Sequence, residues 1–205
     1  MTDCGCGGAA VDTAEQRRVL WIALGLNFGM FGVEVAAGFL AGSVSLLADG
    51  LDMLTDAATY GIALLAIGRT VRFKANAAVL SGTFVLLLGV GVLADAGRRA
   101  VYGGSPEGVW MIAVAAAALA VNAFVLQMLS RQRDPEVHMR AAYICTRADV
   151  VANAAVIASG IAVSVTGWRF ADLIVGAGIG SYVIREALEI FSEARDSRAT
   201  DVTEL

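Results

Sequence analysis

The stretch LLADGLDMLTDAATYGIALLAI, residues 46–67, decides the fold class, because it is apolar over the length of a membrane span yet carries acidic residues near its centre. About 20 apolar residues cross the ~30 Å hydrocarbon core of a bilayer as a helix. Asp52 and Asp56 are four residues apart, so a helix places both on one face. An ionised side chain at such a depth costs about 2.5–3.5 kcal/mol, so these acids require a partner or a function.

A second apolar stretch, AAYICTRADVVANAAVIASGIAVSV at residues 141–165, repeats the pattern with Cys145 and Asp149. A helical rise of about 1.5 Å per residue places Asp56 and Asp149 at the same depth if the two helices are antiparallel. The same arithmetic places Asn153 level with Asp52, and Cys145 about one turn nearer the cytoplasm. Asn153 therefore competes with Cys145 for the fourth position of a shared site.

The composition of the 205-residue chain indicates an integral membrane protein. It is 58% hydrophobic and only 17% charged, with a mean hydropathy of +0.70, whereas soluble domains contain about 25% charged residues. We predict an all-α fold, a compact bundle of six transmembrane helices at residues 19–40, 46–67, 77–93 or slightly beyond, 109–129, 141–165 and 170–191. The expected organisation is a disordered tail at 1–16, a membrane domain at 17–192 and a short polar C-terminal tail at 193–205.

The distribution of positive residues predicts the orientation. Ten Arg and Lys residues fall in the two tails and in the second and fourth connections, and three (Arg98, Arg99 and Arg169) fall on the opposite side. By the positive-inside tendency both termini are cytoplasmic, and we expect a bacterial inner membrane location. Two arginines, Arg147 and Arg185, lie inside predicted spans. No signal peptide is evident, because the first apolar run is too long for one.

The cysteines are not expected to form disulfides. Cys4 and Cys6 lie in a tail predicted to face the reducing cytoplasm, and Cys145 lies in a span. Their C-x-C spacing would allow the tail to catch a soft cation, although a tail without function is slightly favoured because no second pair completes a tetrahedral site.

A mixed carboxylate and thiolate site of Asp52, Asp56, Cys145 and Asp149 favours a divalent transition metal. Zinc accepts tetrahedral sulfur and oxygen ligands, and cadmium is favoured further by the thiolate. These ligands bind metal when deprotonated, so metal loading releases protons and protonation ejects metal. The alternative is that the acids serve helix packing, hydrogen-bonded to Arg147 or to nearby Asn and Thr groups.

The segments SLLADGLDMLTD (45–56), CTRADVVANAAVIASG (145–160) and GWRFADLIVGAGIG (167–180) resemble the cation diffusion facilitator family. The resemblance covers essentially the whole membrane portion. It implies a six-span exporter of zinc, cadmium and related ions, with metal ligands Asp52, Asp56, Cys145 and Asp149, where Cys145 stands in place of the family's usual His. The chain departs from the family in one respect: the family usually has a cytoplasmic metal-binding domain after the sixth span, whereas only about a dozen polar residues follow Phe191 here. We therefore expect a short form without that domain.

Other polar residues inside the spans have two interpretations. In the first, Asn27, Glu34 and Asp49 line a water path or carry protons. In the second, they make hydrogen bonds between helices, with Arg147 or Arg185 as the counter-charge. Asp49 and Asn153, like Cys4 and Cys6, are secondary candidates for metal binding. The single histidine, His138, is expected to be a solvated surface residue.

The expected function is a secondary transporter that exports zinc, cadmium and, by extension, cobalt or nickel, by proton antiport. No enzyme is expected, because an intramembrane metalloprotease requires an H-E-x-x-H helix. The alternatives are a small-molecule or drug exporter, which the 7% aromatic content disfavours, and a non-transporting membrane assembly protein. The expected partners are the lipid bilayer, divalent metal ions and protons, with a homodimer left open; neither a cofactor nor nucleic acid is expected.

Overall fold

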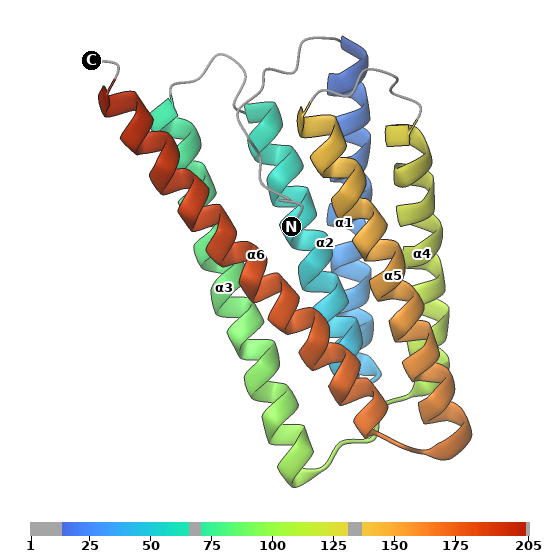
Figure 1. The fold of residues 1–205 in the computed structure, drawn as a ribbon. Helices are drawn as coiled ribbons and strands as arrows, with labels where there is room; N and C mark the ends of the chain where they lie inside the picture. The colour runs from blue at the N-terminus through green and yellow to red at the C-terminus, as the bar shows by residue number, and fades with distance from the viewer. Residues whose placement is uncertain (1–13, 66–70, 131–136, 204–205) are drawn as a thin grey trace.

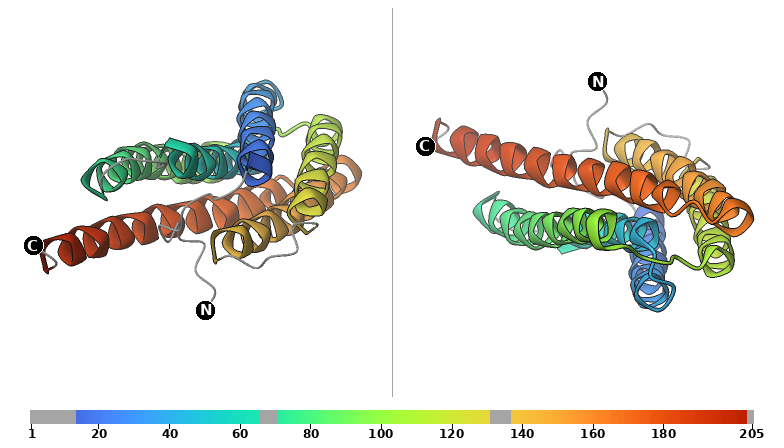
Figure 2. Two further views of the ribbon diagram at one scale, coloured as in Figure 1. Left: turned by 90° about the horizontal axis from the view of Figure 1, so that it is seen from above. Right: turned by 90° about the horizontal axis from the view of Figure 1, so that it is seen from below.

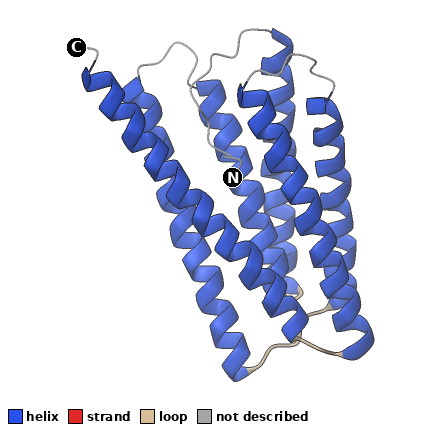
Figure 3. Ribbon diagram, viewed as in Figure 1, coloured by secondary structure: helices blue, strands red, loops and turns tan. Residues whose placement is uncertain are grey.

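Six helices make up the part of the chain that the structure describes. The computed structural model describes residues 14–65, 71–130 and 137–203, and every regular element within these ranges is a helix (Figure 3). The helices are α1 (Ala14–Leu40), α2 (Val44–Leu65), α3 (Val71–Tyr102), α4 (Gly108–Ser130), α5 (Val137–Thr166) and α6 (Phe170–Thr203). The predicted all-α fold and its six helices are confirmed.

The six helices pack as three pairs, and α2 is the central helix of the bundle. α3 lies along α6, α1 lies along α2, and α4 lies along α5 (Figures 1 and 2). α2 also packs against α3 and α6, and over a smaller area against α5. Because α2 touches four helices, nearly every residue from Val44 to Ala57 is buried. The acidic residues of this helix therefore point into the bundle.

The outer surface of the bundle is apolar, as a lipid-facing surface requires. Four helices are long and apolar enough to cross a membrane: Arg17–Leu40, Ala75–Tyr102, Gly108–Met128 and Thr146–Thr166. Only 22–33% of the residues in these spans are buried inside the bundle, so most of their apolar side chains face outward. α2 and α6 run beside them (Figure 1) but carry more charge in their central parts. The chain is an all-α membrane protein.

Several helices extend beyond their predicted spans, and α3 and α6 do so furthest. α3 continues through Arg98 and Arg99, which lie after the predicted end of the third span, as far as Tyr102. Asp95 stabilises this end, because its carboxylate pairs with Arg98 at 2.7 Å and with Arg99 at 2.5 Å, three and four residues later on the same helix. α6 likewise continues as helix to Thr203, through most of the predicted polar tail.

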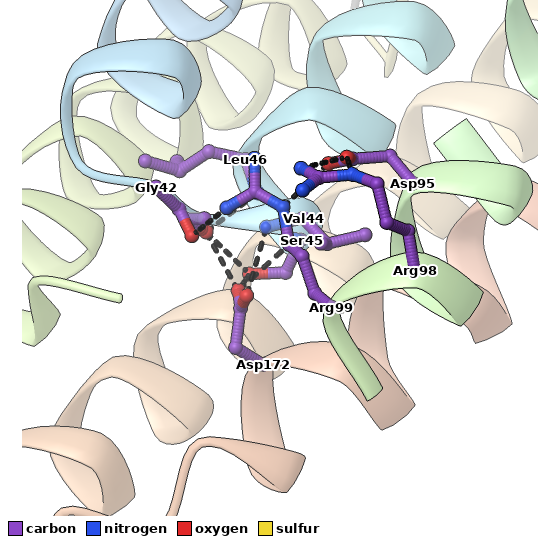
Figure 4. Close-up of polar contacts among 9 residues, drawn as sticks. Gly42, Val44, Ser45, Leu46, Asp95, Arg98, Arg99 and Asp172 are labelled. Carbon is purple, nitrogen blue, oxygen red and sulfur yellow. Dashed lines mark hydrogen bonds and ion pairs between the residues drawn. The ribbon is translucent and has the colours of Figure 1, made fainter. Parts of the chain in front are cut away.

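Asp172 of α6 stabilises one end of the bundle. This end holds the α1–α2, α3–α4 and α5–α6 connections. This carboxylate, 1% exposed, accepts hydrogen bonds from the first turn of α2: from Ser43 Oγ at 2.6 Å, Val44 N at 2.8 Å, Ser45 N at 3.0 Å and Ser45 Oγ at 2.7 Å (Figure 4). Ser43 Oγ in turn accepts from Leu46 N at 3.1 Å and so caps α2. Arg99 donates to the Gly42 carbonyl beside it. α2, α3 and α6 are thus tied together at this end.

Glycines allow the chain to turn sharply at the same end. Gly103 follows α3 with a φ of 97°, and Gly167 follows α5 with a φ of 66°. Each N–H returns to a carbonyl of the last helical turn, Arg99 O at 3.0 Å and Val163 O at 2.9 Å. This left-handed geometry favours glycine because it has no Cβ. The short connections join the end of α3 to the start of α4 and the end of α5 to the start of α6, and of these two pairs α5 and α6 also pack against each other.

Candidate metal centre

The aspartates predicted on α2 and α5 meet inside the bundle. Asp52, Asp56 and Asp149 are 4%, 7% and 4% exposed. Asp149 of α5 lies beside both Asp52 and Asp56 of α2, close enough for the three carboxyl groups to interact. Ionised carboxylates are hydrogen-bond acceptors only, so they cannot bond to one another without a proton or a cation between them. Two helices therefore bring three acidic side chains into one buried cluster.

One oxygen of this cluster has no donor. Asp149 Oδ2 is buried and makes no hydrogen bond, and a buried acceptor left unsatisfied costs about 1–3 kcal/mol. A cation bound to the cluster would satisfy this oxygen. The donor chemistry of the three carboxylates thus fits a divalent metal ion as cargo.

Tyr60 and Thr146 extend the cluster toward the C-terminal end of α2. Tyr60 OH donates to Asp56 Oδ2 over a long 3.4 Å contact, and it lies 3.2 Å from Thr146 Oγ1. Tyr60 is 2% exposed and Thr146 is fully buried. Sequence reasoning did not select either residue, although both recur at helical spacing from the aspartates: Tyr60 is four residues after Asp56, and Thr146 is three before Asp149.

Glu186 of α6 is a further acidic group at the site that sequence reasoning missed. It is 9% exposed, and its charge acts on both Asp52 and Asp149. A carboxylate inside the predicted 170–191 span was a usable signal, because an ionisable residue within a membrane helix is by default a functional candidate. Three helices, α2, α5 and α6, therefore contribute acidic side chains to one region.

Cys145 is on α5, one turn before Asp149, but its side chain falls outside the described residues. The side chains of His138, Cys4 and Cys6 also fall outside the described residues. Among the side chains that the structure does describe, no three His, Cys, Asp or Glu groups are arranged so that they could hold a metal ion. The aspartates lie next to one another but do not surround a common point.

Asn153 belongs to a second polar group, one turn along α5 from Asp149. Asn153 Nδ2 donates to Asp49 Oδ2 at 2.7 Å, and Asn153 Oδ1 accepts from Asn122 Nδ2 of α4 at 3.0 Å. Glu34 of α1 lies beside Asp49. All four side chains are fully buried. Both polar atoms of the Asn153 side chain are thus hydrogen-bonded, to Asp49 and to Asn122, and neither partner belongs to the cluster of three aspartates.

The interpretation of Arg185 as a buried counter-charge is wrong. Arg185 Nε pairs with Glu189 Oε1 at 2.8 Å on the surface of α6, and its side chain is 60% exposed. Arg147 also lies on an exposed face of its helix. Asn27 Nδ2 donates to Ala23 O of its own helix at 2.9 Å, so it is not held by either arginine.

Comparison with known proteins points to one family. Residues 20–197 match the family model described as the cation efflux transmembrane domain. The chain is 29% identical over 192 residues to the metal cation efflux system protein CzcD of Cupriavidus metallidurans, and 29% identical over 193 residues to the zinc transporter ZitB of Escherichia coli. It is 24% identical over 194 residues to the cadmium, cobalt and zinc/H(+)-K(+) antiporter of Bacillus velezensis.

Each of these alignments covers 88% of this chain and 61–62% of the relative. The chain therefore spans about three fifths of the length of the curated relatives that it matches. The match includes all six helices and every aspartate of the buried cluster. The chain belongs to the cation efflux family.

Proposed function

We propose that the protein is a secondary transporter that exports divalent transition-metal cations, with zinc and cadmium as the main cargo and cobalt or nickel as further candidates. The observation that carries this proposal is the position of Asp149, whose buried carboxyl lies beside both Asp52 and Asp56 of a different helix. Three carboxyl groups in a water-poor bundle form a site whose net charge depends on how many protons it holds. CzcD, ZitB and the Bacillus velezensis antiporter are named for metal efflux or zinc transport.

The proposed ligands are Asp52, Asp56, Asp149 and Cys145. The backbone of α5 places Cys145 one turn from Asp149 on the same helix face. The cation would bind when the carboxyl groups lose their shared protons, and protons entering from the receiving side would release it. The chain is then an antiporter without enzymatic activity, and alternating access would expose the buried site to each side in turn.

The proposed orientation has both termini in the cytoplasm of a bacterial inner membrane. In it the Asp172 end of the bundle, with Arg98, Arg99 and Arg169, faces outward, and the positive residues concentrate at the other end. Residues 17–192 would form the transporting domain, and lipid, metal ions and protons would be its partners. A homodimer stays open as a further assembly.

Reconstitution into proteoliposomes tests this function. We expect the purified protein to move Zn²⁺ and Cd²⁺ into vesicles with an acidic lumen, and dissipating the gradient should slow uptake because protons would no longer drive release. A parallel series with a K⁺ gradient tests the second counter-ion in the Bacillus velezensis relative's name. Metal flux that is absent, or that is indifferent to pH between about 6 and 8, contradicts proton antiport.

A further inference from the structure

The second polar group contains a carboxylate that nothing in the bundle satisfies. Glu34 of α1 is fully buried, and neither of its carboxylate oxygens has a hydrogen-bond donor. Its neighbour is Asp49 of α2, whose Oδ2 accepts from Asn153 while its Oδ1 also lacks a donor. The two carboxyl groups lie within hydrogen-bonding reach of each other, but as carboxylates both can only accept.

The backbone brings these two acids together. Gly50 follows Asp49, and a Cβ at this position would lie 3.2 Å from Glu34 Cβ and 3.0 Å from Val35 Cγ2. These distances are shorter than an ordinary van der Waals contact, so α1 approaches α2 this closely because residue 50 has no side chain. Asn153, itself held by Asn122, fixes the orientation of Asp49. The pair is therefore held in place by four helices.

The nearby charges do not neutralise the pair. Asp52 is the further charged group that acts on Glu34, and it has the same sign. The ion pairs that the described arginines make lie elsewhere, between Arg98 or Arg99 and Asp95 and between Arg185 and Glu189. Two adjacent buried carboxylates that share a single donor, Asn153 Nδ2, and have no counter-charge are costly unless a cation or a proton joins them.

We propose that Glu34 and Asp49 form a second divalent-cation site, distinct from the Asp52, Asp56 and Asp149 cluster and one helical turn along α2 from it. Two carboxylates match the charge of one divalent ion, and the available donors are oxygens only, so the site suits harder ions such as Mn²⁺ as well as Zn²⁺. Asn153 is a positioning residue that holds Asp49. On the proposed function, this site lies on the outward side of the first, where a departing ion would pass next.

Metal-binding stoichiometry tests the site without requiring transport. The protein is placed in lipid nanodiscs with Cys4 and Cys6 replaced by serine, so that the tail cannot bind metal, and is dialysed to equilibrium against Mn²⁺ and, separately, Zn²⁺. We expect two Zn²⁺ per chain. Glu34→Gln, which is nearly isosteric, should lose one Zn²⁺ and most of the Mn²⁺, and Asp49→Asn should do the same, so either folded variant suffices.

Two further variants separate the sites. Asp149→Asn should lose a Zn²⁺ but keep the Mn²⁺, and Glu189→Gln, which removes a carboxylate from the surface of α6, should bind as the parent does. Unchanged Mn²⁺ and Zn²⁺ binding in folded Glu34→Gln and Asp49→Asn protein overturns the second site and indicates a shared proton instead. Unchanged Zn²⁺ binding in Asp149→Asn contradicts the first site and the proposed function, while leaving the Glu34 result to be judged separately.

Discussion

Two buried aspartates of this bundle, Asp172 and Asp149, have opposite surroundings. Asp172 accepts four hydrogen bonds from the first turn of α2. Asp149 has one oxygen with no donor, and its neighbours are the carboxyl groups of Asp52, Asp56 and Glu186. The same type of side chain thus joins two helices where donors surround it, and on the proposed function it serves as an exchangeable ligand where acids surround it.

The difference shows why burial alone does not identify a site. Asp172 is as buried as Asp149, yet its charge is satisfied by backbone and hydroxyl donors, so a cation would gain little by binding there. The groups next to Asp149 are themselves acidic and its Oδ2 has no donor, so a proton or a metal ion would stabilise this carboxyl group. If this difference matters, substitution of Asp172 should lower stability, whereas substitution in the cluster around Asp149 should abolish transport.

The largest effect is expected at the buried cluster. Asp52→Asn or Asp56→Asn keeps the shape of the side chain but removes an anionic ligand, which should cost at least about 3 kcal/mol of binding, or roughly 100-fold. In cells that depend on this transporter, resistance to zinc and cadmium should fall to the level of the empty vector. Full resistance with either variant, at normal abundance in the membrane, would remove that residue from the site.

Asp172→Ala should affect folding more than metal binding. The change leaves two hydroxyls and two backbone amides of the α2 terminus without their acceptor, which should cost roughly 2–4 kcal/mol of stability. A lowered thermal transition in detergent, together with Zn²⁺ affinity close to that of the parent for the molecules that remain folded, is the expected result. An unchanged transition temperature would show that Asp172 does not fasten this end of the bundle.

Cys145 variants test the fourth ligand. Cys145→His replaces a soft sulfur with a borderline nitrogen, so the ratio of cadmium to zinc transport should fall by about tenfold. Cys145→Ser should weaken transport of every ion, most of all cadmium, because a neutral hydroxyl is a poor substitute for a thiolate. Unchanged selectivity in both variants, with transport lost in Asn153→Ala, would transfer the fourth position to Asn153.

The smallest effect is expected at Glu186. Its charge lies near Asp52 and Asp149, so Glu186→Gln should lower the affinity for divalent cations by about two- to tenfold through the loss of a long-range attraction. Glu189→Gln, three residues further on the exposed side of α6, is the matched control. If the two variants have equal Zn²⁺ affinities, Glu186 does not contribute to the site.

The helices and the central aspartates could be predicted from the sequence because both depend on local patterns. Apolar runs of span length predicted six helices, and the spacing of four between Asp52 and Asp56 placed them on one face. The apolar run predicts a third span that ends near residue 93, before Arg98 and Arg99. Asp95 pairs with both and lets α3 continue.

The residues that depend on tertiary packing could not be predicted in the same way. Asn153 was level with Asp52 by depth alone, but its bonds to Asp49 and Asn122 are set by how α4 and α5 meet α2. Glu186 lies on a different helix, far along the chain from Asp149, and no spacing in the sequence relates the two residues. The contrast between Asp172 and Asp149 is likewise invisible in the chain, because it depends on donors that lie more than a hundred residues away from Asp172.

Zn²⁺ flux into proteoliposomes with an acidic lumen, compared between Asp149→Asn and Asp172→Asn at equal amounts of folded protein, tests most directly whether the buried acid cluster carries the metal. Both variants remove one buried carboxylate and change nothing else in size. Asp149→Asn should reduce the flux to that of protein-free vesicles, whereas Asp172→Asn should retain flux of the same order as the parent. Parent-like flux in Asp149→Asn, or equal loss in both variants, would contradict the assignment of transport to the cluster around Asp149.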